Sequence, residues 1–271
     1  MVDDFDPGRR PERPGGSDYG SDIHRDYGDE PAPAFRDSAP DVLAPIDASS
    51  PVSGHVPVGD ASATRASLMP EHDWTAASAV VVPLLRPAGT IGLRIDVVDR
   101  AVLLANANKA HTLPLLGDGP CDLAVVYALP AAGFDVIVNG EHLLSWSVEP
   151  GLVHEAAMAN LAAWSATADW SDEVSGDRHL LSSDTGSGLD AARILLPAVR
   201  EHLRAELGSA GRVLVGLPDR HLLLAGGLRP GDDDFAALLR DYVIEHSAAA
   251  DEPIDRRIFE LSGTTLVEFT G

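Results

Sequence analysis

The pattern of apolar and polar residues divides the 271-residue chain into three parts. In the first part, from Met1 to about Asp73, apolar residues show no periodicity, and there are ten prolines and fifteen acidic residues against six arginines. A segment of this composition buries too little apolar surface to offset the loss of chain entropy on folding. We therefore expect a disordered acidic tail over residues 1–75 and a single domain over residues 76–271.

The second part, from Ala77 to Trp146, contains short apolar runs separated by proline, glycine and charged residues. Their length and their valine, isoleucine and leucine content predict antiparallel strands. Asn139-Gly140 is typical of a tight hairpin turn and is expected to join the last two strands. This part is predicted to be a β-meander with strands at Ala79–Leu85, Ile91–Val98, Ala101–Leu104, Leu123–Leu129, Phe134–Val138 and Leu143–Trp146.

The third part alternates helical and strand patterns. Pro150–Trp164 has apolar residues at helical spacing, and Asp232–Asp234 place acidic groups at the positive end of a helix that continues to Val243. Strand pairs are expected at Trp170–Val174 with Arg178–Ser182, at Val213–Leu217 with His221–Ala225, and at Arg257–Leu261 with Thr265–Phe269. The predicted fold class is α+β, an N-terminal β-meander followed by α-β-β-α-β-β, with a mostly antiparallel sheet packed by helices.

The start of one helix is ambiguous in the sequence. Ser187–Asp190 resembles a capping box, from which an apolar stripe runs to Leu207, and Gly208 follows as a stop. Pro197 lies inside that stripe and removes a helical hydrogen bond. We expect either a kink at Pro197 or a helix that starts there.

Composition limits the classes of partner. The formal net charge of −22 opposes binding to nucleic acid or to anionic lipid, and the few basic residues are scattered among acids. The chain has no apolar run long enough to span a bilayer and no secretory leader pattern, so we expect a cytoplasmic protein. Cys121 is the only cysteine, which excludes an intramolecular disulfide and a thiol-based metal cluster.

Several short motifs between about Leu113 and Phe269 occur in an order and at a spacing that suggest a family resemblance. They are Val126–Leu129, Leu144–Trp146 leading to Ala159–Leu161, Gly188–Leu195, and Pro218–Leu223. With these motifs the chain resembles the domain of unknown function 1444 family, the YtpQ-like proteins of bacteria. The resemblance implies an α+β fold and a bacterial origin, but it brings no activity, substrate or cofactor. It does not extend before Ala77, where relatives have a helix and further strands.

The polar residues within or beside these motifs are the first candidates for a ligand-binding cluster. Asp190 and Arg193 are three residues apart and can pair, and Asp219 can stabilise the turn before the next strand. A structural network is the interpretation we favour, and an anion pocket lined by two arginines is the alternative. The candidate set is Asn160, Asp190, Arg193, Asp219, Arg220 and His221.

Asp184-Thr185-Gly186-Ser187 spells the loop of aspartic peptidases, in which two such loops share a proton between their carboxylates. The chain holds one copy, so this chemistry would need a homodimer. Ser182 and Ser183 stand where an apolar strand should lead into the loop. A turn explains all four residues and is the interpretation we favour.

Metal and anion motifs are incomplete. His154-Glu155 begins an H-E-x-x-H pattern in which Met158 replaces the second histidine. The pattern therefore lacks the second of the two imidazole ligands that would bind zinc. Gly186-Ser187-Gly188 could present amides to an anion, but it lacks the lysine of a P-loop. No sequence feature lowers the pKa of Cys121. We expect neither a metal nor a cofactor.

Two hypotheses of function follow. The first is a noncatalytic protein-binding or adaptor module with an unidentified protein partner and no nucleic-acid or membrane ligand; a homodimer is a further candidate assembly. The alternative is an enzyme, either a small-molecule hydrolase using Asp219, His221 and Arg193 or an aspartic-peptidase-like homodimer using Asp184.

The composition of the first part leads to a test of its contribution to stability. A chain that starts near Asp73 should melt within a few degrees of the full-length protein, because the removed residues bury little apolar surface. Thermal unfolding monitored by circular dichroism measures this. Loss of the cooperative transition would mean that the removed segment belongs to the core.

Overall fold

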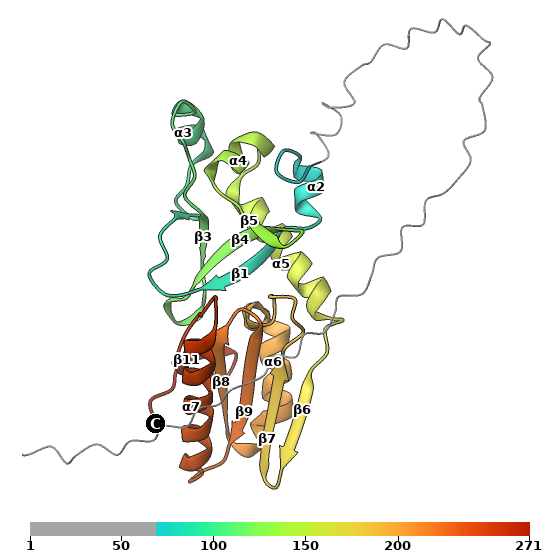
Figure 1. The fold of residues 1–271 in the computed structure, drawn as a ribbon, viewed down its shortest axis with the longest axis vertical. Helices are drawn as coiled ribbons and strands as arrows, with labels where there is room; N and C mark the ends of the chain where they lie inside the picture. The colour runs from blue at the N-terminus through green and yellow to red at the C-terminus, as the bar shows by residue number, and fades with distance from the viewer. Residues whose placement is uncertain (1–68) are drawn as a thin grey trace, which may run out of the picture. The chain divides into compact units, whose positions relative to one another are not determined.

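The computed structural model describes residues 69–271, a mixed α+β arrangement of six α-helices and two mostly antiparallel sheets (Figure 1). The α+β class is therefore confirmed. Most of the predicted tail, residues 1–75, lies outside the described residues. Within residues 69–271, every helix is too short or too polar to cross a bilayer.

The first sheet has the strand order β1-β4-β3-β2, and β5 also pairs with β4. All its pairings are antiparallel except that of β2 with β3, which is parallel. Its strands are β1 (Val82–Arg86), β2 (Leu93–Arg94), β3 (Leu115–Asp118), β4 (Ala124–Ala131) and β5 (Phe134–Ile137). The helices of this part are α2 (Trp74–Ser78), α3 (Arg100–Ala105) and α4 (Gly140–Trp146), with the 3-10 turn η1 (Pro120–Asp122).

The predicted meander is wrong, because two of its expected strands are helices. The strand expected at Ala101–Leu104 lies in α3, whose first turn is capped by Asp99: its Oδ1 accepts a hydrogen bond from the Ala101 N–H at 2.7 Å. The strand expected at Leu143–Trp146 lies in α4. Here the Asn139 side chain accepts from the N–H groups of Glu141 and His142, so Asn139-Gly140 starts a helix instead of turning a hairpin.

The remaining strands of this part agree only partly with the prediction. Ala79–Leu85, Leu123–Leu129 and Phe134–Val138 correspond to β1, β4 and β5 with shifted ends. The long run Ile91–Val98 contributes only the two residues of β2, and β3 was not predicted. Consecutive strands therefore do not lie side by side as a meander requires.

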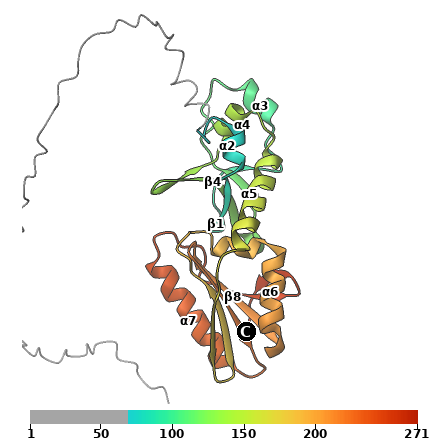
Figure 2. The same cartoon turned by 90° about the vertical axis from the view of Figure 1, so that its right-hand side faces the viewer.

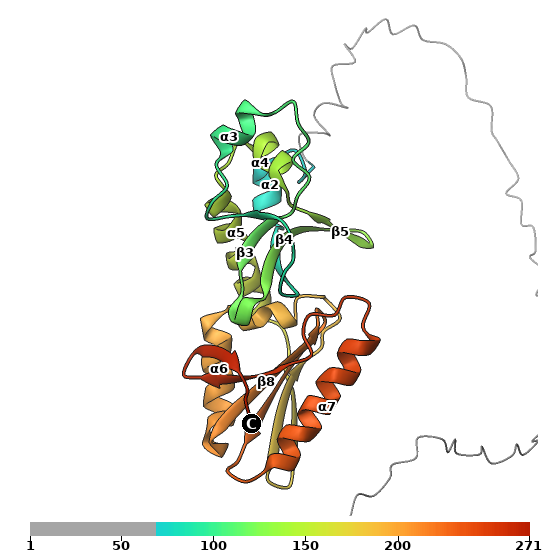
Figure 3. The same cartoon turned by 90° about the vertical axis from the view of Figure 1, so that its left-hand side faces the viewer.

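The second sheet is fully antiparallel and has the order β11-β10-β8-β9-β7-β6. It lies between α6 on one face and α7 on the other, as Figures 2 and 3 show. Its strands are β6 (Ser171–Ser175), β7 (Arg178–Ser183), β8 (Arg212–Asp219), β9 (Leu222–Leu228), β10 (Ile258–Ser262) and β11 (Thr265–Glu268). The helical elements are α5 (Pro150–Ser165), η2 (Ala191–Leu195), α6 (Pro197–Leu207), η3 (Gly208–Ala210) and α7 (Asp233–Ala249).

This half follows the sequence closely. From α5 onward the order α-β-β occurs three times and includes all three expected strand pairs, so the predicted order α-β-β-α-β-β is one unit too short. The late start at Pro197 is confirmed, since Pro197 is the first residue of α6. The capping box at Ser187 is wrong: the 3-10 helix η2 begins at Ala191 and ends before Pro197, because a proline there cannot donate to the preceding turn.

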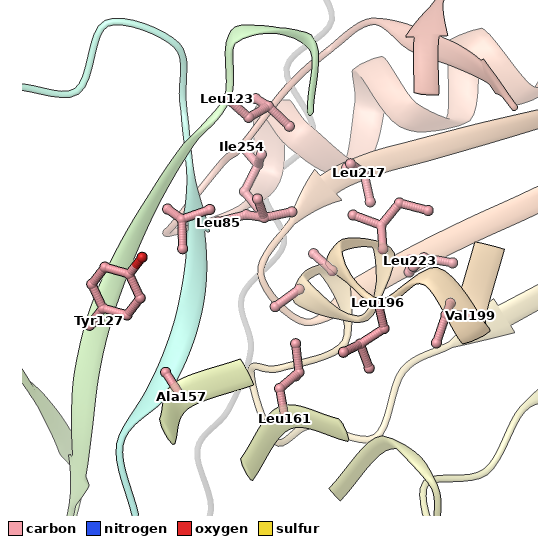
Figure 4. Packing of buried hydrophobic residues seen from close by; sticks show 14 of the residues in the cluster. Leu85, Leu123, Tyr127, Ala157, Leu161, Leu196, Val199, Leu217, Leu223 and Ile254 are labelled. Carbon is pink, nitrogen blue, oxygen red and sulfur yellow. The ribbon is translucent and has the colours of Figure 1, made fainter. Parts of the chain in front are cut away.

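One hydrophobic cluster joins the two sheets. It includes Leu85 of β1 and Tyr127 of β4 from the first sheet, and Leu217 of β8 and Leu223 of β9 from the second, with Leu161 of α5 in the same cluster (Figure 4). On the opposite face of the second sheet, α7 buries Phe235, Leu239 and Val243 in a separate cluster. The shared cluster makes the two sheets depend on one another for their burial.

Residues before position 76 already make contacts with this core region. The Trp146 indole donates a hydrogen bond to the Pro70 carbonyl at 2.8 Å, and its ring centroid lies 5.5 Å from that of Trp74. A truncation that tests the N-terminal segment alone should therefore start at Met69 rather than near Asp73.

The shared cluster predicts cooperative unfolding of both sheets. Leu85→Ala should lower the free energy of unfolding by about 2–5 kcal/mol, since the residue is fully buried, and the protein should still unfold in one transition. Chemical denaturation measures both. Ile91→Ala is the control, because that side chain is 78% exposed and its truncation should change stability by less than about 0.5 kcal/mol. Two separate transitions in the wild type would contradict a shared core.

Candidate functional site

Arg193 is the centre of the strongest polar network among the candidate residues. It lies in η2 and is 1% exposed. Its Nε donates to Ser165 Oγ at 3.1 Å, and Nη1 donates to Ser183 Oγ at 2.7 Å and to the Asp169 carbonyl at 3.1 Å. Nη2 donates to the carbonyls of Ser165 and Ala168, each at 3.3 Å. The five N–H groups of the guanidinium are all used by the protein itself.

Asp190 balances this buried charge through a serine. Asp190 is 0% exposed, and its Oδ1 accepts from Ser183 Oγ at 2.7 Å and from the Thr185 N–H at 3.0 Å. Its Oδ2 accepts from Thr185 Oγ1 at 3.0 Å. The Ser183 hydroxyl thus accepts from Arg193 and donates to Asp190, so the predicted pairing of these residues runs through β7.

Burial lowers the pKa of Arg193, and the negative charge of Asp190 opposes that shift. The Trp170 ring centroid lies 3.9 Å from the guanidinium carbon, which adds a cation–π contact. The network ties the C-terminal end of α5 to β7 and η2. Its geometry is that of a structural support, since no guanidinium N–H is left for a ligand.

Arg220 belongs to a second group of charges. Its Nη1 lies 2.6 Å from Asp135 Oδ2 and 3.2 Å from Glu252 Oε2, and Arg86 Nη1 donates to the same Glu252 oxygen at 2.9 Å. Burial opposes the charge of Arg220, but the two carboxylates more than compensate and its pKa is raised. Because Arg86 lies in β1 and Asp135 in β5, this group links the first sheet to the β8–β9 turn of the second.

Gly188 is fitted to this second group. Its φ of +77° favours glycine, and a Cβ there would lie 2.5 Å from the Arg220 side chain. The Arg220 Nε donates to the Gly188 carbonyl at 3.3 Å. The motif glycine therefore serves the close approach of the arginine.

The other candidates satisfy local backbone groups. Asp219 Oδ1 accepts from the His221 N–H at 2.6 Å, which stabilises the turn, and the His221 side chain is exposed. Asn160 Nδ2 donates to the carbonyls of Ser78 and Val81 at 2.9 and 2.8 Å, so Asn160 holds the segment between α2 and β1. The structure thus joins Asp190 with Arg193 and leaves Asn160 and Asp219 in separate contacts.

The peptidase-like loop wraps around Asp190. Thr185 bonds to Asp190 through its N–H and its hydroxyl, and Gly186 has a φ of +72° that turns the chain. Asp184 itself is exposed at the surface. The four residues are explained by the turn, and none of their contacts favours shared-proton chemistry.

A pocket of about 510 Å³ lies next to Arg193. Its walls are mainly apolar, and the Trp170 and His202 rings, with centroids 5.4 Å apart, form one side. Since the arginine donors are already bonded, the pocket offers shape and apolar contact rather than a charged anchor. It is lined by Ala162, Ser165, Ala166, Trp170, Arg193, Leu196, Pro197, Ala198, Val199 and His202.

The residues of the incomplete metal motifs have ordinary contacts. His154 Nδ1 lies 2.9 Å from the Tyr127 hydroxyl, and burial raises the pKa of that phenol. The Cys121 thiol donates to the Leu266 carbonyl at 3.2 Å, and burial raises its pKa. In the part of the chain that the structure describes, no group of three histidine, cysteine or acidic side chains could hold a metal ion.

Sequence reasoning missed Ser165, Ser183 and Trp170, which complete the Arg193 network. In the sequence, Ser183 stands out only because it replaces an apolar strand residue before Asp184. Its position at the end of β7, seven residues before Asp190, carries no pattern that indicates a bond to Arg193.

The chain matches no protein-family model, no curated protein and no solved structure. The resemblance to the domain of unknown function 1444 family therefore stays a prediction.

The structural role of Arg193 can be measured directly. Arg193→Ala should lower the free energy of unfolding by about 3–5 kcal/mol, because Asp190 would remain buried without its positive partner. Arg204→Ala, at an exposed position of α6, is the control and should change stability by less than about 0.5 kcal/mol. Equal stability of Arg193→Ala and wild type in thermal unfolding would refute the structural role and favour the anion-pocket alternative.

Proposed function

We propose that this protein is a noncatalytic protein-binding module, an adaptor of the bacterial cytoplasm that acts without a metal or cofactor. The polar side chains that could have formed a reactive site are consumed in internal contacts, as described above for Arg193, Asp190 and Arg220. Apolar side chains are also exposed at the surface, in the part of the chain described next. Binding of a protein partner is the function that uses such a surface.

The observation that carries this proposal is the apolar surface of α3 and the loop before it. Val97 is 73% exposed and Val102 57% exposed, and both line a pocket of about 380 Å³. Leu93 and Val98 line the same pocket, and Ile91, beside it in the chain, is 78% exposed. We call Ile91, Leu93, Val97, Val98 and Val102 the α3 surface.

A single exposed apolar side chain is common on protein surfaces and needs no explanation. A group of them around a concave surface favours binding of a protein partner. A partner that inserts one apolar side chain between Val97 and Val102 would remove both from water. That is the arrangement of an interface hot spot, in which a few buried contacts provide most of the affinity.

The test compares two single substitutions of matched chemistry. Val97→Asp should weaken binding of the native partner by roughly tenfold or more, because it buries an unpaired carboxylate in the interface. Val174→Asp, at a 68% exposed position of β6, is the control. Quantitative cross-linking and affinity capture from the source bacterium should yield a protein that Val97→Asp loses and Val174→Asp retains.

A second copy of the chain is one candidate partner, and sedimentation velocity separates it from a foreign protein. A wild-type dimer that Val97→Asp converts to monomer would assign the α3 surface to self-association. If no captured protein distinguishes the two variants and both sediment like wild type, the α3 surface is not a binding site and the proposal fails.

A further inference from the structure

Helix α7 leaves part of its sheet face uncovered. It packs mainly against β8, β9 and β10, while β7 and β6 continue beyond it on the same face (Figure 1). The strand register places Glu173 of β6 opposite Leu180 of β7, and Leu180 opposite Gly226 of β9. A Cβ at Gly226 would lie 2.7 Å from the Phe235 ring of α7, so these positions all face the α7 side of the sheet.

The flank of α7 beside this uncovered strip is apolar and exposed. Leu238 is 58% exposed and Tyr242, one turn later, 42% exposed. The Tyr242 ring stacks on that of His246 with centroids 4.0 Å apart. Leu180 is partly buried and packs against the cluster under α7. We call Leu180, Leu238 and Tyr242, with the carboxylates around them, the α7 face.

Acidic residues lie on this side of the sheet: Glu173 on the α7 side of β6, and Glu245 on α7, three residues after Tyr242. Burial has the largest effect on the pKa of the Tyr242 phenol and raises it. The negative charges of Asp184, Glu173, Asp219 and Glu245 raise the pKa further, with effects that decrease in that order. These acids belong to four separate segments: β6, the β7–η2 loop, the end of β8 and α7. Among residues 69–271, none of the four forms an ion pair with a basic side chain, whereas Asp232 pairs with Arg178.

We propose that the α7 face binds a basic segment of a partner protein. The inference rests on the proposed function and specifies the chemistry of one partner. A guanidinium or ammonium group would lie over the Tyr242 ring and between the surrounding carboxylates. The aliphatic stems and neighbouring apolar side chains of the segment would cover Leu238 and Leu180.

Charge complementarity selects this occupant over the others. A second copy of the chain carries the same net charge of −22 and would bring carboxylates against carboxylates. The chain's own residues up to Asp73 hold fifteen acids and six arginines, so their net charge is also negative. The negative net charge of the protein also opposes binding of the negatively charged phosphates of nucleic acid. A cationic segment is attracted by the whole protein and then paired by this face.

The test uses a fluorescein-labelled peptide of alternating arginine and valine, with a glutamate–valine peptide as the negative probe. Fluorescence anisotropy should show binding of the basic peptide to the full-length protein. Glu173→Arg with Glu245→Arg should weaken that binding about tenfold or more, since two attractions become repulsions. Both positions are exposed, and circular dichroism should show an unchanged fold.

The matched control is Glu201→Arg with Glu206→Arg on α6, which changes the net charge equally at exposed positions on the other side of the sheet. It should keep most of the affinity. Equal loss in both double variants would reduce the binding to net-charge attraction and overturn the inference, as would absence of basic-peptide binding.

Tyr242→Ala supplies a readout that leaves the charges in place. This substitution should also weaken binding of the basic peptide. An unchanged affinity would show that the Tyr242 ring does not contribute to binding. Val97→Asp should not alter peptide binding. If the basic peptide does not bind but a partner is captured at the α3 surface, the basic partner is refuted and the proposed function stands. If the peptide binds but no partner is captured at the α3 surface, the proposed function fails as argued from the α3 surface, while binding at the α7 face stands.

Discussion

A single buried guanidinium connects the elements on which the second half of the protein depends. Arg193 reaches the last turn of α5, the end of β7 and, through Ser183, the carboxylate of Asp190. A charge in this position is tolerated only when its hydrogen-bonding groups are all satisfied, because desolvation of an unpaired ion costs several kcal/mol. The five donors of arginine match five acceptors supplied by three segments. The positions of α5, β7 and η2 are thereby set together.

This arrangement also explains why the surface, not the interior, is the place to look for function. Asp190 and Arg193 serve the fold in the Arg193 network, and Arg220 serves it in the group with Arg86, Glu252 and Asp135 between the sheets. Asn160 and Asp219 satisfy local backbone groups. Within residues 69–271, two of the exposed surfaces are the apolar α3 surface and the acidic α7 face. They belong to different sheets, and their different chemistry would let two partners bind without competing, which is what an adaptor requires.

The sequence predicted the second half well because its elements are long enough for periodicity to identify them. Pro197 fixed the start of α6, and the apolar stripe of α5 gave its length. In the first half the elements are short, so the pattern of apolar residues fits a strand or a helix equally well. Local hydrogen bonds from side chains then decide which of the two forms. Asn139-Gly140 suits a tight turn as well as a helix cap, and only the N–H groups of Glu141 and His142 distinguish them. The pairing of Asp190 with Arg193 was predictable from spacing, whereas the mediation by Ser183 depends on where β7 ends in space.

Among residues 69–271, strand β6 is an edge of the second sheet, and each of its five residues is exposed. Such an edge offers unpaired backbone groups to any extended chain and is a common starting point for fibrillar aggregation. Asp172 and Glu173 occupy its centre with side chains on opposite faces, so two such edges could not pair in register without opposing like charges. The acidic residues that we propose attract a basic partner at this side of the protein therefore also oppose the pairing of β6 with a second copy of itself.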